Sequence, residues 1–126
     1  MAGKSFKDML AEANAVIDSI SIQDARDSLH SNEVVFVDVR ESQERAQGFI
    51  PGSHHAPRGF LEFIADPQGP MHNPALAAGK RVIVYCGSGA RSALAGKTLV
   101  DMGVGKVANL VGGFQAWVQS GGDVEH

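Results

Sequence analysis

Hydrophobic residues follow two patterns along this chain, one with the period of a helix and one in short runs typical of strands. Near the N-terminus, apolar residues recur at helical spacing and predict an amphipathic helix of three to four turns: Phe6, Met9, Leu10, Ala13, Ile17 and Ile20. Ser21, with Asp24 three positions later, is typical of a helix N-cap and predicts a second helix through Leu29.

Three short apolar runs, over residues 34–39, 81–85 and 107–111, predict strands that are buried on both faces. Helices are predicted over residues 41–47, 91–102 and 114–118, with a turn at 50–52 and a short strand at 53–56. The segment 66–79 is rich in Pro and Gly and predicts a loop. Because strands and helices alternate, we expect an α/β fold with a parallel sheet and helices on both faces.

Composition and charge restrict the functional classes. The 126 residues, 44% hydrophobic and 20% charged, suit one globular domain. A net charge of −3 without a basic run argues against a nucleic-acid partner, and the apolar stretches are too short to cross a membrane. Charged residues interrupt the N-terminal segment and argue against a signal peptide, so we expect a cytoplasmic protein. The single cysteine excludes an internal disulfide and a thiolate-rich metal site, and we expect neither metal nor cofactor.

The candidate chemistry lies where the second strand ends. The protein's one cysteine comes directly after this strand and precedes a loop of small residues and an arginine that opens a helix: Cys86, Gly87, Ser88, Gly89, Ala90 and Arg91. Ligands bind at the carboxyl ends of strands in such sheets. Loop N–H groups and the helix N-terminus favour an anion there, which lowers a thiol's pKa. We therefore predict that Cys86 is a nucleophile rather than a structural core residue, with Arg91 as a fixed positive charge for oxyanions.

A second charged group ends the first of the three strands. Asp38 is predicted to be buried, and a buried carboxylate must be paired. Arg40 lies two residues further on, and Arg58 and the cysteine loop offer other partners. We expect Asp38 to brace the structure rather than to transfer protons, and Arg58 to add positive charge near the mouth of the site.

Four sequence blocks, in this order, resemble the rhodanese (thiosulfate sulfurtransferase) domain in its single-domain bacterial form. They occupy residues 37–41, 48–53, 85–92 and 112–117, and the resemblance spans about residues 20 to 119. It implies a five-stranded parallel sheet flanked by helices on both faces, with a persulfide-forming cysteine in the loop after a central strand. It divides the chain into an N-terminal amphipathic helix (1–19), a rhodanese-like domain (20–120) and a flexible tail (121–126).

The resemblance also implies a two-step reaction. Cys86 would take a sulfane sulfur from a small anionic donor such as thiosulfate, and a thiol or cyanide acceptor would then remove it. Backbone N–H groups of Gly87, Ser88, Gly89 and Ala90 would stabilise the anionic persulfide. A protein acceptor or a homodimer is compatible with the sequence. Two alternatives stay open: a persulfide carrier or regulatory binding module with little turnover, and a cysteine-dependent phosphatase, whose related loops are one residue longer.

Overall fold

A five-stranded parallel sheet forms the centre of the molecule. The computed structural model describes residues 3–126. Across the sheet the strands are ordered β1 (Asp18–Ile20), β5 (Val107–Leu110), β4 (Arg81–Tyr85), β2 (Val34–Asp38) and β3 (His54–His55). Every neighbouring pair is parallel, which confirms the predicted fold class. The three strands predicted as buried runs are the three inner strands.

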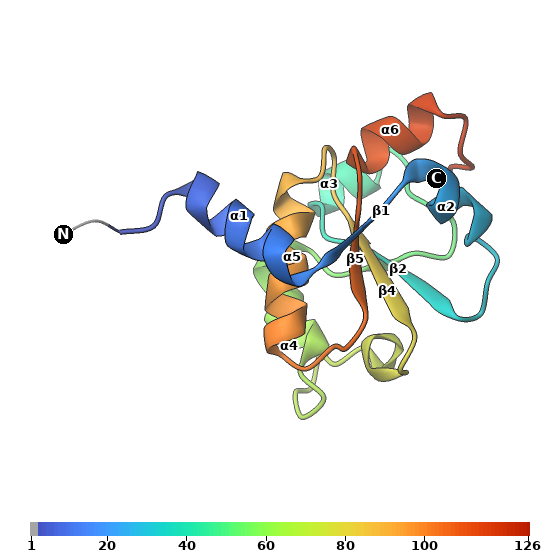
Figure 1. The fold of residues 1–126 in the computed structure, drawn as a ribbon. Coiled ribbons are helices and arrows are strands. Elements are labelled where there is room, and N and C mark those ends of the chain that lie inside the picture. The colour runs from blue at the N-terminus through green and yellow to red at the C-terminus, as the bar shows by residue number, and fades with distance from the viewer. Residues whose placement is uncertain (1–2) are drawn as a thin grey trace.

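Helices cover both faces of the sheet (Figure 1). On one face, side chains of α1 (Phe6–Val16), α4 (Leu61–Ala65) and α5 (Ala90–Asp101) join the first core cluster. On the other face, α2 (Ile22–Asp27) and α6 (Gly113–Gln119) join the second. Short α3 (Ser42–Arg45) follows β2, and two 3₁₀ helices span Arg58–Phe60 and Pro74–Ala77. Within the described residues 3–126, no helix is long and apolar enough to span a membrane.

The N-terminal helix is shorter than predicted. A capping box between Ser5 and Asp8 starts the helix, and the helix ends at Val16. The residues Asp18–Ile20 that follow form the edge strand β1 beside β5. The prediction of one helical stripe through Ile20 was therefore wrong. Ile17 packs into the core on the α1 and α5 face, whereas Ile20 packs into the core of the opposite face. A continuous helix would place both side chains on the same side, so the strand is what separates them.

Two segments hold structure that the sequence pattern did not reveal. Helix α4 was not predicted, although Leu61 at its start is completely buried. Residues 121–126, predicted as a flexible tail, lie against the domain: Glu125 pairs with Phe49, and the Trp117 indole donates to the carbonyl of Asp123 at 2.7 Å. The domain boundaries and the mobility of the tail stay predictions.

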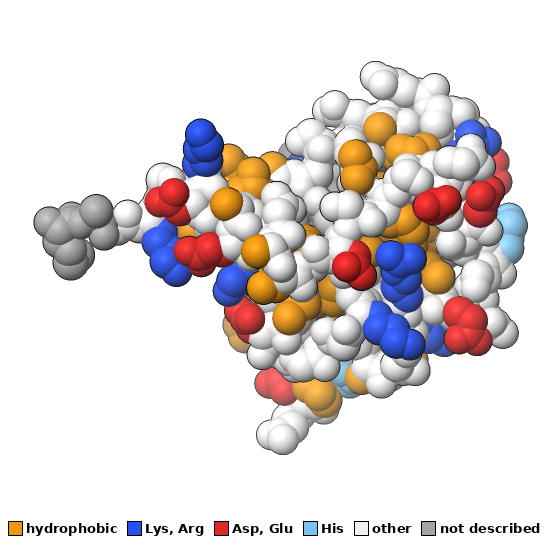
Figure 2. Space-filling view, in the orientation of Figure 1, with side chains coloured by type: hydrophobic (Ala, Val, Ile, Leu, Met, Phe, Trp, Pro, Cys, Tyr) orange, Lys and Arg blue, Asp and Glu red, His pale blue; other side chains and the backbone are white. Residues whose placement is uncertain are grey.

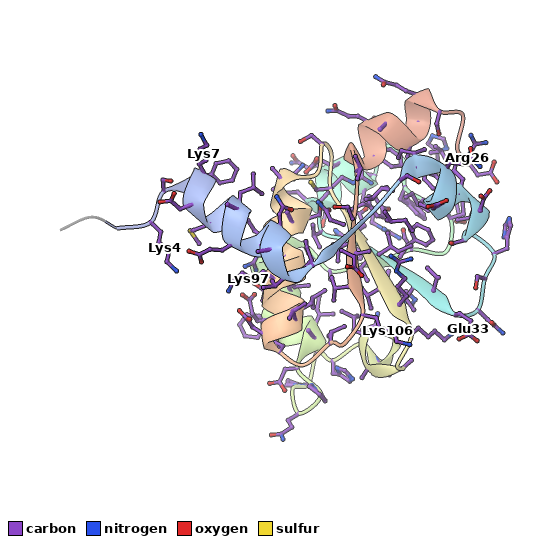
Figure 3. All side chains as sticks on the ribbon, viewed as in Figure 1. Lys4, Lys7, Arg26, Glu33, Lys97 and Lys106 are labelled. Atoms are coloured by element: carbon purple, nitrogen blue, oxygen red, sulfur yellow. The ribbon has the colours of Figure 1, made fainter. Side chains whose placement is uncertain are left out.

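Three connections meet at the carboxyl end of the sheet: the segment after β2 that contains α3, the β4–α5 loop, and the segment from β5 into α6. The β4–α5 loop lies beside α3 and the start of α6 (Figure 1). The opposite end of the sheet carries Glu33 and Lys106 (Figure 3). The surface around α1 mixes hydrophobic and charged side chains (Figure 2). The cysteine loop therefore lies at the end of the sheet where parallel α/β folds bind their ligands.

Candidate active site

Cys86 lies at the carboxyl end of β4, and its side chain is 1% exposed. Its Sγ accepts a hydrogen bond from the Gly89 backbone N–H at 3.1 Å and lies 3.4 Å from the Ser92 hydroxyl. The chain can turn back over the sulfur because Gly89 has a φ of +115°, a left-handed conformation that glycine adopts without a side-chain penalty. The sulfur therefore lies at the N-terminus of α5, inside a loop that donates to it.

These donors control the ionisation of the thiol. Burial by itself raises the pKa of Cys86, because the interior disfavours the charged form. The Ser92 hydroxyl and the backbone N–H groups of Ser92, Gly89 and Ser88 act in the opposite direction, since they stabilise the thiolate. The net effect is a pKa below the ordinary value for cysteine. The site thus stabilises the thiolate more than water does for an ordinary cysteine, in a position that is largely shielded from solvent.

The start of α6 fixes the outer side of the loop. The Phe114 N–H donates to the carbonyl of Cys86 at 2.8 Å, and the Gln115 N–H donates to that of Gly87 at 3.0 Å. Gly113 makes this approach possible: a Cβ there would lie 2.6 Å from the Gly87 oxygen, and its φ is +63°. Because the loop carbonyls are held by α6, the loop N–H groups are left to face the sulfur.

Ser92 and Asn109 hold the loop from beneath. The buried Asn109 side chain, on β5, donates to the Gly89 carbonyl at 3.0 Å and accepts from the Ser92 hydroxyl at 2.6 Å. The Ser92 hydroxyl has one proton and three acceptors in reach, namely Asn109, the Gly89 carbonyl at 3.2 Å and Cys86 Sγ. Strand β5 is thereby linked to the cysteine through one hydroxyl group.

Arg91 lies beside the loop but is held by a carboxylate. Its two terminal nitrogens contact the two carboxylate oxygens of Glu44, on α3, at 2.6 and 2.8 Å. This contact lowers the pKa of Glu44 to about 2 and raises that of Arg91. A Cβ at Gly87 would lie 3.3 Å from Arg91 Nη2, so the ion pair borders the loop directly. The structure therefore brings Arg91 to the predicted site together with an unpredicted negative charge.

Asp38 and Arg40 have contacts that suit a structural brace. The completely buried Asp38 carboxylate accepts from Arg40 Nε and Nη2, both at 2.9 Å, and from Arg45 Nη1 at 3.1 Å. The Arg40 guanidinium also lies 4.3 Å from the centroid of the Phe114 ring, on α6. These groups tie β2 and α3 to the helix that holds the loop. Their positions are those of supporting residues rather than of groups facing the sulfur.

Arg58 does not lie at the loop. Its guanidinium donates to Glu62 at 3.0 Å and to the Thr98 hydroxyl at 3.2 Å. Thr98 lies eight residues after Ala90 on α5, about 12 Å along the helix axis. The expectation that Arg58 adds charge near the mouth of the site is therefore corrected: the side chain pairs with its i, i+4 partner Glu62 and contacts the C-terminal half of α5.

Sequence reasoning missed Glu44, Asn109 and the role of Ser92. Asn109 had a usable signal, because a polar residue within the apolar run 107–111 must find a hydrogen-bond partner. Glu44 had none, since it lies in a polar stretch that reads as an exposed helix. Among residues 3–126, no group of three or more His, Cys, Asp or Glu side chains is placed to hold a metal ion.

Comparison with known proteins identifies relatives over nearly the whole chain. The family model for the rhodanese-like domain matches residues 21–120. A protein of Allochromatium vinosum named "Sulfurtransferase" is 35% identical over 91 residues, which cover 72% of this chain and 78% of the relative. A Bacillus subtilis protein named "Putative sulfur carrier protein YrkF" is 32% identical over 85% of this chain and 54% of its own length.

A solved structure from Rhodopseudomonas palustris is similar over the full length. It superposes with a TM-score of 0.93 at 43% identity and covers 99% of this chain and 97% of its own. It is described as a protein of unknown function, "Possible Tyrosine Phosphatase". The family match begins directly after β1 and covers the other four strands and the whole cysteine loop. The chain therefore belongs to the rhodanese-like domain family.

Proposed function

We propose that this protein is a sulfurtransferase that carries a sulfane sulfur on Cys86 as a persulfide. The proposal rests on one observation: hydrogen-bond donors of the loop and of Ser92 surround Cys86 Sγ and lower the pKa of this buried thiol. A thiolate is the form of cysteine that attacks sulfur, and these donors can also stabilise a terminal persulfide anion. The sulfurtransferase and sulfur carrier names among the relatives support this chemistry.

The proposed reaction has two steps. The Cys86 thiolate attacks the outer sulfur of a small anionic donor such as thiosulfate; a new S–S bond forms, the donor's S–S bond breaks, and sulfite leaves with the electron pair. A thiol or cyanide then attacks the terminal sulfur of the persulfide and regenerates the Cys86 thiolate. Neither step requires an external oxidant, because the sulfane sulfur is passed on at the same oxidation level.

Turnover with thiosulfate and cyanide tests the proposal. Thiocyanate should form with the wild-type protein and should be absent with Cys86→Ser, because the substitution removes the chain's only thiol. Circular dichroism and thermal unfolding of both proteins provide the control, since serine fits the space of cysteine and should leave the fold intact. Equal thiocyanate formation by the two proteins would overturn the proposal.

A carrier or regulatory module with little turnover is the second candidate, favoured by the resemblance to the Bacillus subtilis protein. A carrier would load Cys86 stoichiometrically but release its sulfur only slowly to cyanide or to small thiols. Single-turnover loading followed by steady-state assays separates the two: fast loading with turnover supports the enzyme, and fast loading without turnover supports the carrier.

A phosphatase is the third candidate, favoured by the description of the Rhodopseudomonas palustris structure. From Cys86 through Arg91 the loop has six residues, which leaves less space for a tetrahedral phosphate than the longer loops of phosphatases. Hydrolysis of an aryl phosphate that disappears in Cys86→Ser, without any uptake of sulfur, would favour this candidate over the sulfurtransferase.

A further inference from the structure

The charges beside the cysteine loop are arranged unusually for a site that would bind oxyanions. Arg91 is the cation nearest to the loop, and both arms of its guanidinium are occupied by Glu44. The pair lies against Gly87, where a Cβ would be 3.3 Å from Arg91 Nη2 and 3.9 Å from Glu44 Oε2. A ligand above the loop therefore meets a cation and an anion side by side.

Five other basic side chains lie in positions where they do not replace this charge. Arg40 and Arg45 both pair with Asp38, and Arg58 pairs with Glu62. Lys97 pairs with Asp101, away from the loop on α5, and Lys106 lies at the opposite end of the sheet (Figure 3). An anion in the site is thus held by backbone N–H groups and by an arginine whose charge is offset.

The Glu44 carboxylate beside Arg91 affects ligands differently according to their negative charge. A dianion is repelled by Glu44 about twice as strongly as a monoanion in the same position, because the Coulomb energy is proportional to charge. Glu44 also occupies the end-on fork of the Arg91 guanidinium, which could otherwise bind a phosphate monoester or thiosulfate with two hydrogen bonds. An alkyl persulfide carries at most one negative charge and needs only the N–H donors of the loop.

Resting on the proposed sulfurtransferase function, we propose that Glu44 is a specificity-determining residue. It favours sulfur donors of low charge, namely persulfides of small or protein-bound thiols, over dianionic oxyanions. In the favoured reaction the Cys86 thiolate attacks the outer sulfur of R–S–SH, the donor's S–S bond breaks, and R–S⁻ leaves. The product is Cys86–S–SH, whose proton is lost to water, so no oxidant or reductant is needed.

The low pKa of Glu44, about 2, supports a permanent role in this selection. A carboxylate that stays ionised throughout the range in which Cys86 is reactive offsets Arg91 at every working pH. For donors whose own charge changes little with pH, the ratio of their loading rates should therefore stay constant from about pH 6 to 9. This range lies far above the pKa of the Glu44 carboxyl group.

The test measures the rate at which Cys86 is loaded with thiosulfate and with 2-hydroxyethyl persulfide, whose only ionisable group is the persulfide, using the wild type, Glu44→Gln and Glu41→Gln. Glutamine keeps an oxygen that can accept the Glu41 backbone N–H, so the start of α3 is retained. Glu41→Gln is the matched control, because it removes a carboxylate at the N-cap of the same helix, and this carboxylate does not pair with Arg91. We expect Glu44→Gln to raise loading by thiosulfate on the order of tenfold and loading by the persulfide about threefold or less.

Binding of inorganic sulfate gives a second readout that does not depend on sulfur transfer. Sulfate should protect Cys86 from alkylation by neutral iodoacetamide at about tenfold lower concentration in Glu44→Gln than in the wild type. If both donors load Cys86 but the ratio of their rates and the sulfate protection are unchanged in Glu44→Gln, this inference is wrong while the proposed function stands. If neither donor loads Cys86, the proposed function itself fails.

Discussion

Cys86 owes its chemistry to the few atoms that donate to its sulfur. Burial alone would hold the thiol neutral, and the loop N–H groups and the Ser92 hydroxyl reverse this effect. The Ser92 hydroxyl shares its one proton between Asn109 Oδ1 at 2.6 Å and Cys86 Sγ at 3.4 Å, so a side chain on the neighbouring strand competes with the sulfur for this donor. At this scale reactivity depends mainly on hydrogen bonds, because Arg91, the cation beside the loop, is paired with Glu44.

Substitution of Ser92 by alanine should raise the pKa of Cys86. The thiolate is the reactive form, so the alkylation rate rises with pH through the thiol's pKa and levels off above it. A hydrogen bond to a charged group contributes about 1.5 kcal/mol or more, so its loss should move this midpoint to higher pH by about one unit. The measurement is the pH profile of Cys86 alkylation by iodoacetamide.

Ser88→Ala is the matched control for this profile. Its side-chain hydroxyl makes no hydrogen bond in the described structure, and the substitution retains the Ser88 backbone N–H. The control profile should coincide with that of the wild type. An unchanged midpoint in Ser92→Ala would show that the backbone N–H groups alone set the pKa.

At the scale of elements, two helix starts meet at the loop. The N-terminus of α5 surrounds the sulfur, and the N-terminus of α6 binds the carbonyls on the outer side of the same loop. This division leaves the loop N–H groups free for the sulfur, and it explains why two consecutive glycines precede Phe114. Both have a positive φ, and Gly113 lies too close to the loop for any side chain.

Gly113→Ala should therefore distort the loop as well as strain the backbone. A left-handed backbone costs alanine about 1 kcal/mol, and the contact with the Gly87 carbonyl should add to this cost. The control is Gly121→Ala, which has a φ of +84° but no atom within 4 Å of the new Cβ. Thermal unfolding and sulfur loading are measured for both variants.

We expect both alanine variants to lose stability, and only Gly113→Ala to lose loading of Cys86. If the two variants lose stability equally and both load Cys86 like the wild type, then α6 does not shape the loop in the way described.

For the whole molecule, the buried cluster of Asp38, Arg40 and Arg45 joins the sheet to the helices around the site. Asp38 ends the inner strand β2, and Arg40 reaches the carbonyl of Gly48 at 2.8 Å and the ring of Phe114. A buried arginine left without its carboxylate is strongly destabilising, because its charge then lacks both solvent and partner. The cluster is therefore expected to contribute to global stability rather than to the reaction.

Asp38→Ala should lower the free energy of unfolding by about 3–5 kcal/mol, the usual cost of breaking a buried ion pair. Asp101→Ala is the control, because it removes the carboxylate of an exposed pair on α5 and should change stability little. Urea unfolding followed by circular dichroism gives both values. A loss in Asp38→Ala no larger than that in Asp101→Ala would contradict the brace.

Much of this architecture was predictable from the sequence, and the limits have physical causes. The inner strands were predicted correctly because strands buried on both faces form continuous β-branched runs. Ser21 was identified as an N-cap because few residue types take this position. Edge strand β1 was missed because three residues are too few to show a strand period, and its Ile20 continued a helical spacing. Glu44 was missed and Arg58 was misplaced because the partner of a charged side chain is set by tertiary contacts.

The mass of the intact protein before and after incubation with excess thiosulfate tests the central claim most directly. The account predicts that the wild type gains the mass of one sulfur atom, that a thiol or cyanide removes it, and that Cys86→Ser gains nothing. Because Cys86 is the only cysteine, a gain cannot be attributed to another thiol. No gain in the wild type, or an equal gain in Cys86→Ser, would contradict the account.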